Sequence, residues 1–262
     1  EIIFTSSGSE SNNMVLKGIL ENGDHLITSS YEHPSILKLI PSLEEKGIEI
    51  SYIDPDTDGM IQLEAVKEQI QENTTLISVM YVNNELGTIN PIKEIADFCH
   101  EKNILFHSDG VQALGKIPID IKQIPINFLS MSAHKIYGPK GAGALFIKKG
   151  STINPLIHGG GQEFNLRGST ENIIGIGGFG LAAEIAIENI TKNSAYIKQL
   201  GIHFINALNN KKISYKINGG NCVPGVFNIT FPLIEGQDLV MQLDMAGIAI
   251  SWPKTIFPIN SV

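Results

Sequence analysis

The sequence predicts an α/β fold, with a mainly parallel seven-stranded sheet and helices on both faces. Two observations support this fold class. Apolar runs of strand length alternate with longer segments of helical periodicity through most of the chain, a pattern typical of parallel sheets joined by helical crossovers. The chain also has 262 residues, of which 42% are apolar and 18% charged, so it can bury a large core.

Seven apolar runs bounded by polar or turn-forming residues are the strand candidates. They span residues 2–5, 25–29, 48–53, 76–82, 104–107, 128–131 and 144–147. Helical periodicity lies between them at residues 11–20, 34–45, 62–71 and 92–100. In a parallel sheet of this kind a ligand binds beyond the carboxyl ends of the strands, so the residues that directly follow each strand are the first candidates for chemistry.

The pattern changes after a glycine-rich stretch at residues 159–161. Beyond it the sequence predicts a long helix at residues 172–209, short strands at 214–217 and 226–231, and a helix at 237–245. We therefore predict a large domain at residues 1–171. Residues 172–262 are expected to form a linking helix and an incomplete α+β domain.

Composition argues against several classes of partner. The formal net charge is -8 and no cluster of Lys and Arg is present, whereas nucleic acids and anionic membranes need a basic surface. No apolar run approaches the roughly 18–20 residues of a membrane span, so we expect no membrane partner. Cys99 and Cys222 are the two cysteines, which is no disulfide framework and indicates a reducing, cytoplasmic location.

Polar residues follow several of the predicted strands. Residues 6–10 lead from the first strand into a helix, where backbone N–H groups can face an anion such as phosphate. Ser9 could instead be a simple helix N-cap. His33 follows the second strand and could stack on or protonate a ligand, or only neighbour a helix start. Asn83 and Asn84 follow the fourth strand, where amides are expected to have no role in the core.

His107 and Asp109 follow or end the fifth strand candidate. A carboxylate at this place is a strong polar marker, because the other strand ends carry little charge. The two residues are spaced so that they share one face of a strand, which would permit a metal ion. No third ligand with a recognisable spacing follows them, and we therefore predict no metal site.

Lys135 stands in the most informative segment, where a strand ends in Ser-Ala-His-Lys and a Gly-Pro turn follows. Its neighbours are small or specific rather than charged, which disfavours an ordinary surface lysine. An amine close to apolar walls has a lowered pKa and can attack an aldehyde. Pyridoxal phosphate has such an aldehyde and needs a carboxylate at its pyridine nitrogen. Asp109, one predicted strand upstream, has the required chemistry.

Several blocks of the sequence, in order along the chain, resemble the cysteine desulfurases, which are class V aminotransferase-like pyridoxal-phosphate enzymes of fold type I. The similarity runs from residue 1 to about residue 251. It is carried by residues 4–13, Glu32 with His33, residues 82–88, Asp109 with Gln112, residues 132–141 and residues 159–163. The resemblance implies that residues 1–171 are a pyridoxal-phosphate-binding large domain.

The resemblance also implies a role for each matching position around the cofactor ring. Lys135 would hold pyridoxal 5'-phosphate covalently through its amine, and Asp109 would pair with the ring nitrogen. His33 would stack on the ring and, with Lys135 and Asp109, form the catalytic group. Asn84 and Gln112 would reach ring substituents, Gln112 the phenolic oxygen.

A second group of matching positions would hold the cofactor's phosphate. These are Ser9, Ser132 and His134, together with the backbone of Gly8. Thr170 resembles a threonine that reaches the phosphate of the neighbouring subunit, which implies a homodimer. The family usually has Ala-Thr or Gly-Thr where this chain has Gly8-Ser9, and the hydroxyl is kept.

The family takes sulfur from L-cysteine, leaves alanine and carries the sulfur as a persulfide on an enzyme cysteine. The sulfur then passes to an iron–sulfur scaffold or another sulfur-acceptor protein. Residues 243–251 resemble the strand that leads to that cysteine, but residues 252–262 contain none. Cys99 falls in a predicted helix and Cys222 lies well before the loop, so neither is expected to carry sulfur.

We therefore expect a piece of a longer protein, truncated or frame-shifted after Ser251 and lacking an upstream segment. Such a chain could hold the cofactor without completing desulfuration. Two alternatives stay open, a non-catalytic truncated homologue and a related lyase or aminotransferase such as selenocysteine lyase. A G-x-G-x-x-G match at residues 175–180 lacks the flanking strands and acidic residue of a nucleotide site, so it indicates helix packing.

Overall fold

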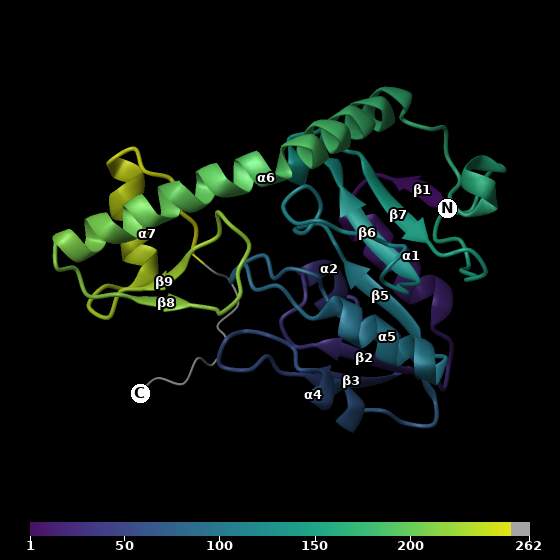
Figure 1. The fold of residues 1–262 in the computed structure, drawn as a ribbon. Helices are drawn as coiled ribbons and strands as arrows, with labels where there is room; N and C mark the ends of the chain where they lie inside the picture. The colour runs from purple at the N-terminus through teal and green to yellow at the C-terminus, as the bar shows by residue number, and fades with distance from the viewer. Residues whose placement is uncertain (253–262) are drawn as a thin grey trace.

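The computed structural model describes residues 1–252 and centres on one seven-stranded sheet (Figure 1). The strand order is β1-β7-β6-β5-β4-β2-β3. The strands are β1 (Ile2–Thr5), β2 (His25–Ser29), β3 (Glu49–Ile53), β4 (Thr74–Ser78), β5 (Leu105–Asp109), β6 (Phe128–Ser132) and β7 (Gly143–Ile147). β3, β2, β4, β5 and β6 lie side by side in this order and are parallel to one another. β7 is antiparallel to both β6 and β1. The predicted fold class is confirmed.

The segment expected to replace the cysteine-bearing loop, residues 252–262, lies outside the described residues except for Trp252. The predictions that concern this loop are therefore not addressed by the structure.

The helices alternate with the parallel strands, with one difference from the prediction. They are α1 (Gly8–Ile19), α2 (Pro34–Leu37), α3 (Ile40–Glu44), α4 (Leu63–Glu68) and α5 (Ile92–Lys102). The single helix predicted at residues 34–45 is wrong, because the chain forms two short helices there. Pro41 lies in the first turn of α3 and has no N–H with which to continue the hydrogen bonds of α2.

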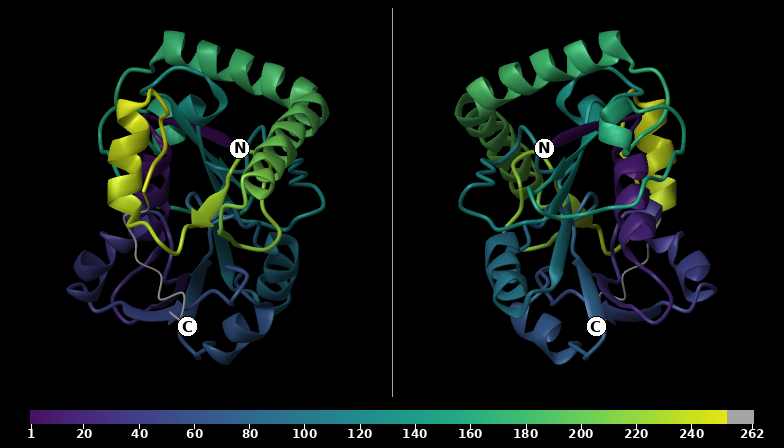
Figure 2. Two further views of the ribbon diagram at one scale, coloured as in Figure 1. Left: turned by 90° about the vertical axis from the view of Figure 1, so that its left-hand side faces the viewer. Right: turned by 90° about the vertical axis from the view of Figure 1, so that its right-hand side faces the viewer.

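Two apolar cores lie on opposite faces of the sheet. Ile27, Ile77 and Phe106 belong to one core. Their strand neighbours Leu26 and Leu76 belong to the other, because successive side chains of a strand point to opposite faces. Seen from the side, α1 and α5 lie on opposite sides of the strands (Figure 2). Helices on both faces are confirmed, and a ligand must approach the sheet at the ends of its strands.

The chain leaves the sheet after β7. The later elements are η2 (Gln162–Asn165), α6 (Ile173–Asn210), β8 (Lys216–Asn218), β9 (Asn228–Thr230) and α7 (Gly236–Met245). β8 and β9 form a separate antiparallel pair. The segment between them is hydrogen-bonded to the loop that follows β4, since the N–H of Ile89 donates to Asn221 O and the N–H of Val223 donates to Gly87 O, each at 2.8 Å. The division into domains at residue 171 stays a prediction.

α6 is the longest helix of the described chain and carries many exposed apolar side chains, among them Ile174 at 89% exposure. By length and composition it could cross a membrane, so the expectation that no apolar run reaches that length is wrong for this helix. Glu184 and Glu188 lie within it, however, and charged side chains are costly in hydrocarbon. Its Phe179 is buried in a small core with Ile136, which ties α6 to the large sheet.

Gly143, the first residue of β7, has no space for a side chain. A Cβ at this position would lie 2.6–2.8 Å from three backbone atoms of Ser7. We predict that Gly143→Ala lowers the free energy of unfolding by about 1–3 kcal/mol, because the backbone has to shift to admit the methyl group. Urea denaturation measures this change.

Gly180→Ala in α6 is the matched control. Nothing lies within 4 Å of a Cβ built there, so alanine should stabilise the helix by up to about 1 kcal/mol. If the two substitutions changed the free energy of unfolding equally, the close approach of β7 to Ser7 would be refuted.

Candidate active site

A buried carboxylate lies at the carboxyl end of β5. Asp109 ends the strand and is 5% exposed. Its Oδ2 accepts a hydrogen bond from Asn12 Nδ2 at 2.7 Å, and its Oδ1 accepts one from the N–H of Val111 at 3.0 Å. The pKa of Asp109 is raised, because burial outweighs the two hydrogen bonds and the charges of His33 and Lys135, which lower it. The carboxylate can still accept a hydrogen bond from a cationic N–H.

A chain of hydrogen bonds joins Asp109 to His33. Asn12 Nδ2 donates to Ser35 Oγ at 2.9 Å as well as to Asp109. Ser35 Oγ lies 2.8 Å from His33 Nδ1, which also accepts from the Ser35 N–H at 3.1 Å. Because Nδ1 is an acceptor, the neutral ring carries its proton on Nε2. The pKa of His33 is lowered, chiefly by burial and also by the charge of Lys135, although the charge of Asp109 raises it.

Lys135 lies on the short helix η1 (Ala133–Ile136), which directly follows β6. Its side chain is exposed, so the expectation of an enclosed amine is met only in part. Apolar walls are present on one side, because Lys135 and Lys116 line a cavity of about 720 Å³ with Leu181 and Ile185 of α6. Gln112 is close by, since its Oε1 accepts a hydrogen bond from Lys116 Nζ.

The predicted phosphate-binding residues lie at the start of α1 and the end of β6. Gly8 begins α1, and a Cβ there would lie 2.4 Å from Val111 Cγ2 and 3.7 Å from Ser132 Cβ. A side chain at position 8 would have to displace the Val111 methyl group, so glycine helps this turn to approach the ends of the central strands closely. Ser132 Oγ lies 2.9 Å from His134 Nδ1, which places these two predicted residues side by side.

Ser7, and not Ser9, is the N-cap of α1. Its Oγ accepts a hydrogen bond from the N–H of Glu10 at 3.3 Å, so the alternative of Ser9 as the cap is wrong. Ser9 lies in the first turn with an exposed side chain. Its hydroxyl and the unpaired N–H groups of the helix start can meet an anion.

Two further predicted site residues lie in loops. Asn84 is half-buried in the turn after β4, and Thr170 is exposed in the loop before α6. Asn83 has the structural role that the sequence was expected to exclude. It is 1% exposed, and its Oδ1 accepts hydrogen bonds from the N–H groups of Glu85 and Leu86.

The cluster suits a ligand that combines an aldehyde, a basic ring nitrogen and an anionic group. Lys135 offers an amine, Asp109 a carboxylate and His33 a flat ring, while the turn at Gly8 packs closely against Val111. Asn12 Oδ1 is buried and lacks a hydrogen-bond partner in residues 1–252. The amine and the carboxylate are features that pyridoxal phosphate requires of its site, and the residues present fit that cofactor.

His107 serves the core rather than a metal. Its Nδ1 lies 2.8 Å from Ser78 Oγ and its Nε2 lies 3.0 Å from Ser130 Oγ. Burial lowers the pKa of His107 to about 3, so the ring is neutral and both nitrogens are occupied by hydroxyl groups of the neighbouring strands. Within the described residues, no group of three metal-ligating side chains is found.

Asn12, Ser35 and Glu32 take part in this cluster or lie next to it, although no role was predicted for them from the sequence. The signal for Asn12 is a polar residue on the apolar stripe of a helix, one turn before Leu16. Glu32 is fully buried, and its Oε1 accepts hydrogen bonds from Ser29 Oγ at 2.6 Å and from the Met80 N–H at 2.8 Å.

Burial raises the pKa of Glu32 to about 8, although those two hydrogen bonds lower it, and the charge of Asp109 raises it further. A carboxyl group whose pKa is higher in the folded than in the unfolded chain binds its proton more tightly when folded. Its contribution to stability therefore decreases as the pH rises from the unfolded value of 4.5 to about 8.

We predict that Glu32→Gln removes part of this pH dependence. Relative to the unsubstituted chain, its free energy of unfolding should gain up to about 1.4 kcal/mol per pH unit between about pH 5 and pH 8. Urea denaturation at several pH values measures the difference. Parallel curves for the two proteins would show that Glu32 is ionised throughout.

Comparisons with known proteins agree with this geometry. The aminotransferase class-V family matches residues 1–252. Cysteine desulfurase IscS of Clostridium botulinum is 46% identical over 256 residues, covering 95% of this chain and 64% of the relative. The mitosomal cysteine desulfurase of Encephalitozoon cuniculi is 44% identical over 252 residues, covering 93% of this chain and 58% of that protein.

Solved structures show the same relationship. A NifS-like protein superposes with a TM-score of 0.91 at 37% identity, covering 96% of this chain and 70% of its own. A NifS-like protein from Rickettsia africae superposes with a TM-score of 0.89 at 36% identity, covering 97% and 70%. This chain spans about two thirds of the length of the proteins it matches. With its sheet, its strand-end cluster and the match over residues 1–252, the chain belongs to the aminotransferase class-V family.

Proposed function

We propose that this chain is the cofactor-holding part of a pyridoxal-phosphate-dependent cysteine desulfurase, which takes sulfur from L-cysteine and leaves L-alanine. The observation that carries the proposal is the group at the ends of β5 and β6: Asp109 ends β5, a chain of hydrogen bonds joins it to His33, and Lys135 follows β6. The 46% identity to a protein named as a cysteine desulfurase supports cysteine as the substrate.

The ring of the cofactor would be held by five side chains. Lys135 Nζ would bind its aldehyde carbon, and Asp109 would accept the hydrogen bond of its protonated ring nitrogen. His33 would lie on the ring face, and Gln112 and Asn84 would reach ring substituents. When bound, pyridoxal phosphate supplies an electron sink for bonds at the substrate's α-carbon.

The phosphate would be held by Ser9, Ser132 and His134 with the backbone at Gly8. The side chain of Thr170 is exposed, which leaves it free to reach the phosphate of a second copy. We therefore propose a homodimer in which each copy completes the phosphate site of the other.

Two side chains are suited to move protons at the substrate. Lys135 Nζ has no ion-pair partner among residues 1–252 and can accept or return a proton at the α-carbon. His33 carries its proton on Nε2, the nitrogen that its hydrogen bonds leave free, and can donate it to a substrate atom. Asp109 stays ionised when a cationic ring nitrogen faces it.

Neither cysteine of the chain is suited to carry sulfur. Cys99 is fully buried, and burial raises the pKa of its thiol to about 12. Cys222 donates to Leu86 O at 3.3 Å, and burial raises its pKa as well. Because the thiolate is the nucleophile, we propose that sulfur leaves for an acceptor such as an iron–sulfur scaffold by way of a cysteine outside this chain, in a reducing, cytoplasm-like compartment.

Lys135→Ala tests the covalent attachment. We predict that the unsubstituted chain holds pyridoxal phosphate on Lys135 after borohydride reduction, located by peptide mass spectrometry, and that the variant holds none. Lys140→Ala is the matched control, since Lys140 is an exposed lysine of the same segment. Attachment that survives in Lys135→Ala at the same yield would refute the assignment.

L-Cysteine tests the substrate. We expect it to change the absorbance of the bound cofactor, while D-cysteine leaves the absorbance unchanged. Sulfide release should stay close to the buffer background, because neither Cys99 nor Cys222 is suited to take the sulfur. Robust cysteine-dependent sulfide release by this chain would contradict that part of the proposal, and a response to L-selenocysteine alone would redirect the substrate assignment.

A further inference from the structure

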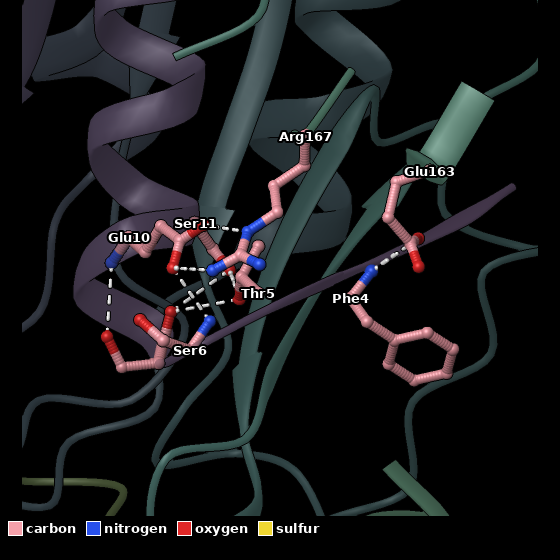
Figure 3. A network of polar contacts seen from close by, with 8 residues as sticks. Phe4, Thr5, Ser6, Glu10, Ser11, Glu163 and Arg167 are labelled. Carbon is pink, nitrogen blue, oxygen red and sulfur yellow. Dashed lines mark hydrogen bonds and ion pairs between the residues drawn. The ribbon is translucent and has the colours of Figure 1, made fainter. Parts of the chain in front are cut away.

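A shielded ion pair joins the start of α1 to the loop that precedes α6 (Figure 3). Arg167 Nε donates to Glu10 Oε1 at 2.8 Å, and Arg167 Nη2 donates to Glu10 Oε2 at 3.3 Å. The N–H of Ser6 donates to the same Oε2 at 2.8 Å. The side chains of Arg167 and Glu10 are only 18% and 10% exposed, so water screens this pair less than it screens a surface pair.

Contact between the two side chains favours the charged form of each. Burial by itself raises the pKa of Glu10, yet the net shift is downward, because the hydrogen bonds from Arg167 and Ser6 and the charge of Arg167 favour the carboxylate. The same hydrogen bond raises the pKa of Arg167. Two-point contact between a guanidinium and a carboxylate also fixes their orientation, so the pair restrains direction as well as distance.

The loop that contains Arg167 has an unusual backbone. Residues 163–165 have φ between +47° and +66°, and Ser169 has φ of +106°. Such conformations cost energy in residues other than glycine and persist only where the surroundings hold them. A second contact helps, since the N–H of Phe4 donates to Glu163 Oε2 at 2.9 Å (Figure 3).

The loop is also closed on itself. The N–H of Gly168 donates to Ile157 O at 2.9 Å. A Cβ on Gly168 would lie 2.7 Å from Gly159 N, so the two stretches of backbone touch. Gly168 directly follows Arg167, so a shift of Arg167 moves this closed part of the loop, which ends two residues before Thr170.

We propose that Glu10 and Arg167 are positioning residues that lock the start of α1 and the loop of Thr170 into one geometry. This inference rests on the proposed function, in which α1 begins at the cofactor's phosphate and Thr170 serves the phosphate of a second copy. Glu10 lies two residues after Gly8, within the same helical turn. The pair therefore couples the phosphate site of one copy to the residue that this copy presents to the other.

The test compares Glu10→Gln, Arg167→Gln and the double variant with the unsubstituted chain. Lys93→Gln and Asp97→Asn provide the control, because this pair on α5 is close, at 2.6 Å, but 57% and 44% exposed. The first readout is hydrogen exchange in the cofactor-free chain. Exchange should become about ten-fold faster at residues 6–10 and 163–170, with the central strands unchanged.

The second readout separates a phosphate effect from a general loss of order. The dissociation constant for pyridoxal phosphate should rise about three- to thirty-fold in each single variant, and no further in the double variant, because the two side chains act as one unit. Binding of pyridoxal, which lacks the phosphate, should be unchanged. Arg167→Lys should recover part of the affinity, since it keeps the charge but not the two-point contact.

The inference would be overturned if the variants kept their affinity for pyridoxal phosphate or lost as much affinity for pyridoxal. It would also be overturned if the loss of affinity in the double variant were the product of the losses in the single variants. Unchanged exchange at residues 163–170 would also overturn it, while leaving the proposed function intact. An unsubstituted chain that binds no pyridoxal phosphate would overturn the proposed function together with the phosphate step.

Discussion

The buried carboxyl group of Asp109 is the constraint on which the arrangement of the site depends. A carboxylate removed from water is unstable unless donors or positive charges surround it. Here α1 supplies the Asn12 amide, the turn after β5 supplies the Val111 N–H, and the charges of His33 and Lys135 oppose the effect of burial. Four separate stretches of chain must therefore meet at one strand end, and a protonated ring nitrogen would complete the set.

The buried polar side chains near Asp109 supply no positive charge to it. His107 precedes it by two residues on β5 and bonds Ser78 and Ser130 on the neighbouring strands. Because burial keeps this imidazole neutral, it offers no compensating positive charge. Glu32 is also buried near Asp109 and has a raised pKa, so it adds little negative charge at neutral pH. His107, Ser78 and Ser130 satisfy one another, which leaves Asp109 to face a cationic ligand.

Around this centre the chain is organised by contacts of two kinds. The large sheet is held by two apolar cores, whereas the loop at residues 157–170 is held by polar contacts to Phe4 and Glu10. α6 is attached through Phe179 but leaves much apolar surface exposed. Polar contacts of this kind specify direction more strongly than apolar packing does, which suits the proposed role of Thr170 in this loop.

Local patterns determined the fold class, because alternating periodicities of strand and helix are written in neighbouring residues. They also predicted that His33, Asp109 and Lys135 follow or end strands, where a parallel sheet gathers ligand-facing residues, whereas the roles expected of Gly8 and Ser132 came from the resemblance. Tertiary structure alone decided what these residues touch. Asn12 and Ser35 are far from Asp109 in the sequence, so their hydrogen bonds could not be predicted from spacing. Although the split at Pro41 has a local cause, the core role of Asn83 and the exposure of Lys135 likewise depend on which surfaces meet. The same is true of Glu10 and Arg167, which lie 157 positions apart and which only the folded chain brings into contact.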